Sequence, residues 1–175
     1  MMAENSPVFS SKSNGIVERA VQSVQGMIRT LRSAVEEKWK VKLPTDHAIW
    51  PRMAEYAGYL LSRAEVGKDG RTAYERLKGK KAKLQRHEFG EAVLWKRRPE
   101  GGPLGKLTCM WDDGVYLGVK PTTGEMIIGD ERGVWRTRTT RKKCGSEKWD
   151  PENVKKIAGV PGRRTWRTRR RMERN

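Results

Sequence analysis

The sequence predicts an α+β protein with an amino-terminal helical hairpin, then a small antiparallel β-barrel, and then a basic tail. Three observations predict this order. Near the amino terminus, apolar residues recur at helical spacing in two long segments. Beyond residue 88 the pattern changes to short alternating segments separated by turn residues. The last segment, 146–175, is Arg-rich and has too little apolar content to fold until it meets an anion.

The first helix is expected from about Gly15 to about Lys40. Asn14-Gly15 is a turn dipeptide, and Asn14 can cap the helix that follows. One face of this segment is apolar: Val17, Ala20, Val21, Val24, Met27, Ile28, Leu31 and Val35. Glu18 lies off that face, in the first helical turn, on a polar stripe that continues through Gln22, Gln25 and Arg29.

A second helix is expected from about Asp46 to Ala64, and a short third one from Thr72 to about Leu77. The second has an apolar face: Ile49, Trp50, Met53, Ala54, Ala57, Leu60 and Leu61. The third starts at a Thr cap and ends at Gly79. We therefore place a helical part at 1–79 and a basic linker at 80–87, which contains Lys80, Lys81 and Lys83.

Segment 88–145 is expected to form the barrel. The predicted strands are Phe89–Trp95, Lys106–Trp111, Val115–Lys120, Glu125–Ile128 and Val134–Thr140. Asp113-Gly114 indicates either a turn or a bend within one long strand. Because a small barrel needs large apolar side chains inside, Trp95, Trp111 and Trp135 are expected in its core.

The positive charge is concentrated in the second part of the chain. The net charge is +17; residues 1–70 hold 10 basic and 8 acidic side chains, and residues 71–175 hold 28 and 13. This asymmetry indicates a polyanionic partner, DNA or RNA rather than a membrane, because no basic amphipathic helix with a large apolar face appears there. Arg136 and Arg138 would share a face of an alternating strand. The predicted nucleic-acid contacts there are Lys80, Lys81, Lys83, Arg136, Arg138, Arg141, Lys142, Lys143, Arg163, Arg164, Arg167, Arg169, Arg170 and Arg171.

Other classes of site find no support in the sequence. Cys109 and Cys144 stand far apart and are expected to be free thiols of an intracellular protein. With His47 and His87 they complete no metal-ligand spacing. The sequence contains no Gly-rich phosphate loop, no nucleophile–base pattern and no apolar run of membrane-spanning length.

The segment before the first helix resembles the last acidic motif of retroviral and retrotransposon integrases. Pro7-x-x-Ser10 and then residues 13–19 (SNGIVER) match a run in which N-G-x-x-E-R opens a long helix. Residues 72–80 (TAYERLKGK) are similar to the run that follows the core helices in that family. Residues 89–95 (FGEAVLW), 105–111 and 114–118 (GVYLG) resemble successive strands of its SH3-like carboxyl-terminal domain.

The resemblance implies that the helical part is a remnant of an RNase H-like core and that the barrel is SH3-like. Glu18 would be the third carboxylate that binds catalytic Mg²⁺, and its stripe (Gln22, Gln25, Arg29) would approach DNA. The family's two catalytic aspartates lie well before this Glu, and residues 1–12 contain no Asp. Since one carboxylate cannot position two Mg²⁺ ions, we expect a fragment that is nuclear or intracellular and does not cut or join DNA alone.

Two alternatives stay open. The chain can be an RNA- or chromatin-binding SH3-like protein with no transposon role, or an enzyme subunit that obtains its missing aspartates from another chain. In addition, no upstream sheet covers the apolar faces of the hairpin. The hairpin would then rest on a partner chain, pair with a second copy, or be only marginally stable.

Overall fold

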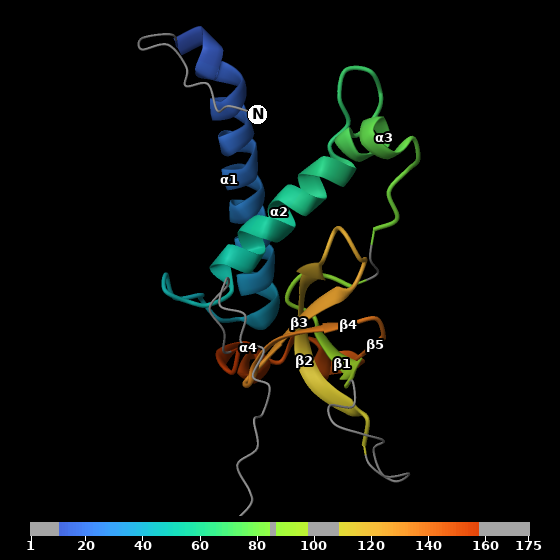
Figure 1. Ribbon diagram of the computed structural model, residues 1–175. Coiled ribbons are helices and arrows are strands. Elements are labelled where there is room, and N and C mark those ends of the chain that lie inside the picture. Colours follow the sequence, from blue (N-terminus) through green and yellow to red (C-terminus); the bar gives the residue numbers. More distant parts are fainter. Residues whose placement is uncertain (1–10, 85–86, 98–108, 158–175) are drawn as a thin grey trace, which may run out of the picture.

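In the computed structural model, the described residues are 11–84, 87–97 and 109–157. They form an α+β fold in which helices lie against one antiparallel sheet (Figure 1). The elements are α1 (Ser11–Trp39), α2 (Trp50–Ala64), α3 (Ala73–Lys78), β1 (Ala92–Lys96), β2 (Trp111–Val119), β3 (Met126–Asp130), β4 (Gly133–Thr137), β5 (Thr140–Lys142), the 3-10 helix η1 (Gly145–Trp149) and α4 (Pro151–Lys155).

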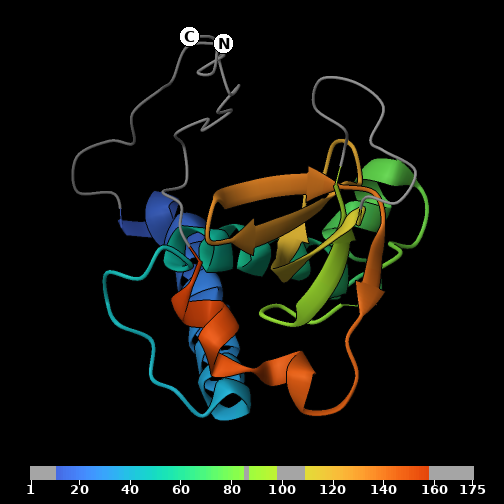
Figure 2. The same cartoon turned by 90° about the horizontal axis from the view of Figure 1, so that it is seen from below.

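The sheet has five strands in the order β4-β3-β2-β1-β5, and all neighbours are antiparallel. The first four strands form a meander, and β5 then pairs with the free edge of β1. β4 and β5 follow one another in the chain yet lie at opposite edges of the sheet, joined only by Arg138 and Thr139. The sheet must therefore curl strongly at that end, as Figure 2 shows.

The expectation of a closed barrel is not met, because the described strands form an open, curled sheet with β4 and β5 at its two edges. The segment expected as one strand, Val134–Thr140, instead divides between β4 and β5. Arg138 consequently lies in the connection and not on a strand face shared with Arg136. Asp113-Gly114 lies within β2, so the bend alternative describes this site better than a turn.

The helical hairpin and the sheet share one hydrophobic core. Trp39 of α1 and Met53 of α2 are buried together with Val93, Tyr116 and Ile128 of the sheet. Trp39 packs so closely on Gly90 that a Cβ at that position would lie 2.7 Å from its Cζ2 atom. The sheet thus covers part of the apolar surface of the hairpin, for which the sequence showed no partner.

The start of α1 differs from the sequence expectation. The helix runs without interruption through Ser13-Asn14-Gly15, so Asn14-Gly15 is not a turn and Glu18 is not in the first turn. The carboxyl-terminal half packs on α2, whereas the amino-terminal half extends away from the body of the molecule (Figure 1). Ile16, Val17 and Val21 are therefore exposed on the apolar face of that half.

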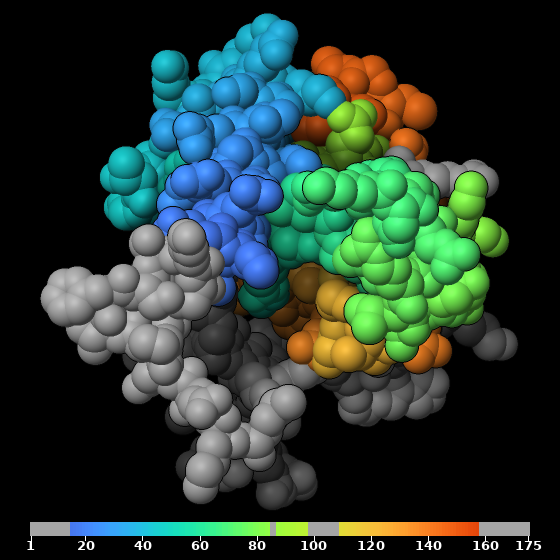
Figure 3. Space-filling model, turned by 90° about the horizontal axis from the view of Figure 1, so that it is seen from above, coloured from blue at the N-terminus to red at the C-terminus, as the bar shows by residue number. Residues whose placement is uncertain are grey.

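The expected caps of the short helix α3 are confirmed. The Thr72 hydroxyl accepts a hydrogen bond from Glu75 N–H (3.2 Å), and the Glu75 carboxylate accepts one from Thr72 N–H (2.7 Å). The helix ends at Gly79, which is left-handed. From there the chain passes beside the β2–β3 turn, which lies next to α3 in the view from above (Figure 3).

The beginning of the expected basic tail is folded. Residues 145–149 form η1, and Asp150 caps α4 by accepting a hydrogen bond from Glu152 N–H (2.9 Å). Val154 and Ile157 are buried in the core. These side chains, with the partly buried Trp149, pack the segment on the core, and the expectation of disorder is wrong for 146–157. The predicted arginine contacts between 163 and 171 lie outside the described residues.

Candidate nucleic-acid interface

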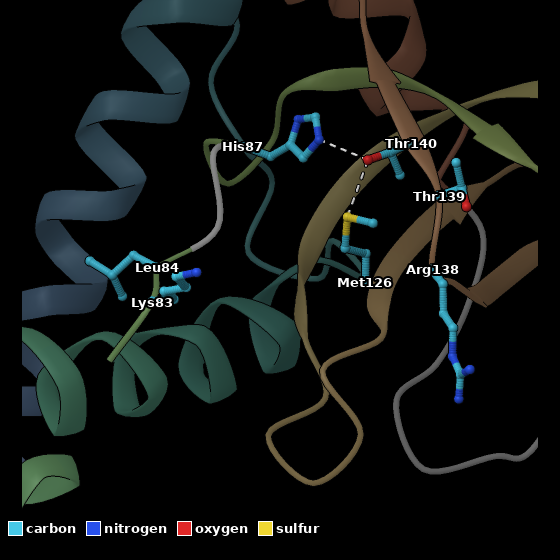
Figure 4. A pocket seen from close by; sticks show the side chains of 7 residues that line it. All are labelled: Lys83, Leu84, His87, Met126, Arg138, Thr139 and Thr140. Carbon is cyan, nitrogen blue, oxygen red and sulfur yellow. Dashed lines mark hydrogen bonds between the residues drawn. The ribbon is translucent and has the colours of Figure 1, made fainter. Parts of the chain in front are cut away.

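Two of the basic segments expected to bind nucleic acid meet at one pocket. Its volume is about 580 Å³, and it is lined by Lys83, Leu84, His87, Met126, Arg138, Thr139 and Thr140. Lys83 and Leu84 come from the linker, whereas Arg138, Thr139 and Thr140 come from the β4–β5 region on the opposite side (Figure 4). The fold therefore places cations from distant parts of the sequence on either side of one hollow.

The crossing between β4 and β5 fixes the Arg138 side of the pocket. The Thr137 hydroxyl donates to Lys96 O (3.2 Å), and Lys96 N–H donates to Thr139 O (3.0 Å). These bonds hold the connection against the end of β1. Arg138 then projects outward, with 76% of its side chain exposed and its Nε atom 3.6 Å from Glu125 Oε1.

A chain of polar contacts forms one wall of the pocket. The Thr140 hydroxyl donates to Met126 Sδ (3.1 Å), and its oxygen is hydrogen-bonded to His87 Nε2 at 2.8 Å. His87 Nδ1 lies 3.5 Å from Glu91 Oε1, and the ring centroid lies 5.4 Å from that of Tyr116. Since the His87 side chain is only 8% exposed, this wall is pre-formed.

Lys142, at the end of β5, and Lys143, which follows it, each lie beside a carboxylate. Lys142 Nζ lies 4.0 Å from Glu91 Oε1, and Glu91 is fully buried. Lys143 pairs with Asp113, and only 14% of the Lys143 side chain is exposed. These two lysines compensate acidic groups of the fold, so they offer less positive charge to a ligand than the sequence suggested.

Arg97 and Arg132 also bind carboxylates of the sheet. Both donate hydrogen bonds to Asp112, at 2.6–2.9 Å, and Arg132 reaches Asp130 as well. Burial alone would raise the pKa of Asp112, but the hydrogen bonds from Arg132 and Arg97 outweigh it and hold that pKa below its usual range. These arginines bind carboxylates within the protein, which separates them from the exposed linker lysines Lys80, Lys81 and Lys83.

A different arrangement occurs at Arg141. Its guanidinium carbon lies 4.3 Å from the centroid of the Trp111 ring, and Arg141 is exposed. Trp111 is half-buried and does not belong to the shared core, whereas Trp95 is buried and Trp135 packs on the core from its edge. The expectation that Trp111 fills the interior is therefore wrong.

The residues of the α1 stripe lie on the helix as expected, and Glu18, Gln22, Gln25 and Arg29 are all exposed. Within the described part of the chain, no group of three or more His, Cys, Asp or Glu side chains is placed to hold a metal ion. An exposed, solitary carboxylate does not fit the several oxygen ligands that Mg²⁺ requires. We therefore derive no catalytic step from Glu18, and its metal role stays a prediction of the resemblance.

Similarity to known proteins gives no indication of what this site does. Comparisons with protein-family models, with curated proteins and with solved structures find no match. Across the described ranges, no helix combines the length and apolar character needed to cross a bilayer. The function must accordingly be inferred from the chain's own residues.

Several residues of the interface were not among the predicted contacts, including His87, Thr139 and Trp111. His87 was considered only as a metal ligand, and Thr139 lies in the connection that the sequence presented as a strand. A signal existed for Trp111, because it alternates with Asp113 along β2 and so falls on the same face as a charged residue.

Proposed function

We propose that this chain binds nucleic acid without strong sequence preference, as a catalytically incomplete part of a retrotransposon-type integrase. The observation that carries the proposal is that Lys83 and Arg138 line the same pocket although they come from different segments. Two cations on either side of a hollow match a phosphate backbone that runs across it.

The chemistry of the pocket fits this ligand. The guanidinium of Arg138 can bind phosphate oxygens through its planar fork, and Lys83 adds a mobile point charge. Thr139 and Thr140 contribute hydroxyl groups, while Leu84 and Met126 provide an apolar surface between the charges. Contacts of these groups to phosphate and sugar carry no sequence information, which accounts for the proposed lack of sequence preference.

The strand arrangement supports an SH3-like assignment of the sheet. Five short antiparallel strands in a meander, with β5 returning to β1, give the strongly curled shape expected of a small barrel. The motifs that resemble integrase sequences in this region lie on or beside the first two of these strands, β1 and β2. On this proposal the chain contributes DNA or RNA binding, and strand transfer needs aspartates from another polypeptide, with Mg²⁺ bound only in that assembly.

The test is a charge reversal at the pocket. We expect Lys83→Glu/Arg138→Glu to weaken binding to labelled DNA or RNA by more than tenfold, with a smaller slope of log affinity against log salt concentration. Fluorescence anisotropy across a salt series measures both quantities. The matched control is Lys155→Glu/Lys156→Glu on and beside α4, which changes the net charge equally but lies outside the pocket lining.

Equal losses in the two double variants would show that only net charge matters, and the pocket would then not be the interface. A wild-type affinity that does not change with salt would remove the proposal as a whole. Strand transfer by the purified chain with Mg²⁺ would contradict catalytic incompleteness.

A second candidate is favoured by the shared core. Because the hairpin packs on the sheet itself, the two parts resemble one cooperative unit more than a core remnant with a separate domain. That arrangement suits an RNA- or chromatin-binding SH3-like protein with no transposon role. The gene sequence upstream of Met1 distinguishes the candidates, since only the integrase origin requires two aspartates encoded there.

A further inference from the structure

We infer that the outer face of the sheet, formed by β5, β1 and β2, holds an unpaired base stacked on Arg141. The nucleic acid bound at this face is therefore single-stranded. This surface is defined by Arg141, Trp111 and Lys96, and none of the three lines the pocket described above. The inference rests on the proposed nucleic-acid binding and names the kind of strand that is bound.

The strand register brings these side chains together. β1 lies between β5 and β2, with Leu94 opposite both Arg141 and Asp113, and Lys96 opposite Trp111. Since side chains alternate along a strand, all five fall on one face of the sheet. Val93 and Trp95, on the other face of β1, are buried in the core. The Arg141 face is therefore the outer one, and Figure 2 shows β5 beside β1.

Arg141 is positioned for stacking before any ligand arrives. Its guanidinium carbon lies 4.3 Å from the centroid of the Trp111 ring, a cation–π contact that favours this position of the long side chain. A guanidinium held over an indole still exposes its second planar surface, and a base can stack there. The ordering cost on binding is thus smaller than for a free surface arginine.

The charges around Arg141 permit approach of a polyanion. Lys96 is exposed on the same face and can contact a phosphate next to the stacked base. Asp113 is the acidic side chain nearest in register, and its carboxylate pairs with Lys143. That pairing offsets the repulsion which a solitary carboxylate would exert on the backbone.

A duplex does not satisfy this surface. Within a helix each base is covered above and below by its neighbours, so no π-face is available to the guanidinium. An unpaired strand offers such a face at every base. Stacking tolerates all four bases, which agrees with the absence of sequence preference proposed for the pocket.

The experiment compares Arg141→Lys with wild-type protein on single-stranded, double-stranded and abasic oligonucleotides of equal length. Lysine keeps the charge but lacks the planar group, so we expect about a tenfold loss of affinity for the single strand. Duplex affinity and the salt dependence should stay unchanged. An oligonucleotide with abasic sites should bind wild-type protein and Arg141→Lys equally. Arg71→Lys, between α2 and α3, is the matched control, because Arg71 is exposed and belongs neither to this face nor to the pocket, and it should lose nothing.

Trp111→Leu provides a second variant, because it keeps an apolar contact for Arg141 but removes the ring; we expect a smaller loss, again confined to single strands. If wild-type protein binds with salt dependence but Arg141→Lys changes nothing, the stacking inference fails alone. If wild-type protein binds no nucleic acid at all, the proposed function fails first. Equal losses of Arg141→Lys on single and double strands would also overturn the inference.

Discussion

Gly90 shows how one residue can set the distance between the hairpin and the sheet. Its φ is +86°, and a Cβ there would lie 2.7 Å from Cζ2 of the buried Trp39. We expect Gly90→Ala to lower the free energy of unfolding by about 2–5 kcal/mol, from left-handed strain plus the displacement of Trp39. Chemical denaturation monitored by tryptophan fluorescence measures this loss.

Gly124→Ala is the control for the backbone term. Gly124 also has a positive φ, +70°, but an added Cβ would meet no atom within 4 Å. Gly124→Ala should therefore lower the free energy of unfolding by only about 1–2 kcal/mol. If both alanine variants lose the same free energy, Trp39 does not pack against Gly90 as described.

Two buried tyrosines, Tyr56 and Tyr116, make the stability of the fold depend on pH at high pH. Burial, with the neighbouring Tyr59 as a smaller cause, raises the pKa of Tyr56 to about 12; burial also raises that of Tyr116, well above its usual range. An acid whose pKa is raised by folding stabilises the protein below its unfolded pKa. For Tyr56 this contribution is present below about pH 10 and is lost as the pH rises through about 12.

Tyr116→Phe tests this explanation. Among the described residues, nothing forms a hydrogen bond with the buried Tyr116 hydroxyl, so phenylalanine should raise the free energy of unfolding by about 1–3 kcal/mol. The variant should also unfold at a higher pH than wild-type protein when followed by circular dichroism. An unchanged alkaline midpoint would mean that Tyr116 does not ionise during unfolding.

At the scale of elements, capped and strongly periodic segments are predictable from the sequence. The Thr72 cap and Gly79 fixed α3, and the end of α1 near Lys40 was found to within a residue. The start of α1 was missed because a long helix, anchored at its other half, tolerates an Asn-Gly pair, of which the glycine costs about 1 kcal/mol relative to alanine.

Gly114 was ambiguous for a different reason. A Cβ there would lie 2.4 Å from Cγ2 of Ile128, so glycine permits close packing inside β2 and does not mark a turn. An Asp-Gly pair in the sequence looks the same whether it forms a turn or lies inside a strand. Only the position of Ile128, on the neighbouring strand, distinguishes them.

The interface was predictable in its residues but not in its arrangement. Charge alone indicated Lys83 and Arg138, yet their convergence depends on the crossing from β4 to the far edge of the sheet. No local pattern separates that crossing from a continuous strand between Val134 and Thr140. Similarly, the role of Trp111 depends on Arg141, which reaches it across β1.

At the scale of the whole molecule, the shared core determines how the chain unfolds. Trp39, Met53, Tyr116 and Val154 are all buried in one cluster, although they come from α1, α2, β2 and α4. A sheet without the hairpin would expose the apolar surface that these helices cover. We therefore expect the whole chain to unfold in a single cooperative transition, measured by calorimetry and by circular dichroism together.

A shared core also predicts that the sheet does not fold without the hairpin. Residues 80–157 contain the whole sheet and α4 but lack Trp39 and Met53, so we expect this fragment to show neither dispersed amide signals in NMR spectra nor a thermal transition. Residues 11–157, which retain the core, should show both and serve as the control. The sequence alone favoured a separate barrel at 88–145, and that reading predicts the opposite result. A folded 80–157 fragment would therefore show that the hairpin only rests on an independent domain, and Gly90→Ala would then weaken that docking without unfolding the sheet.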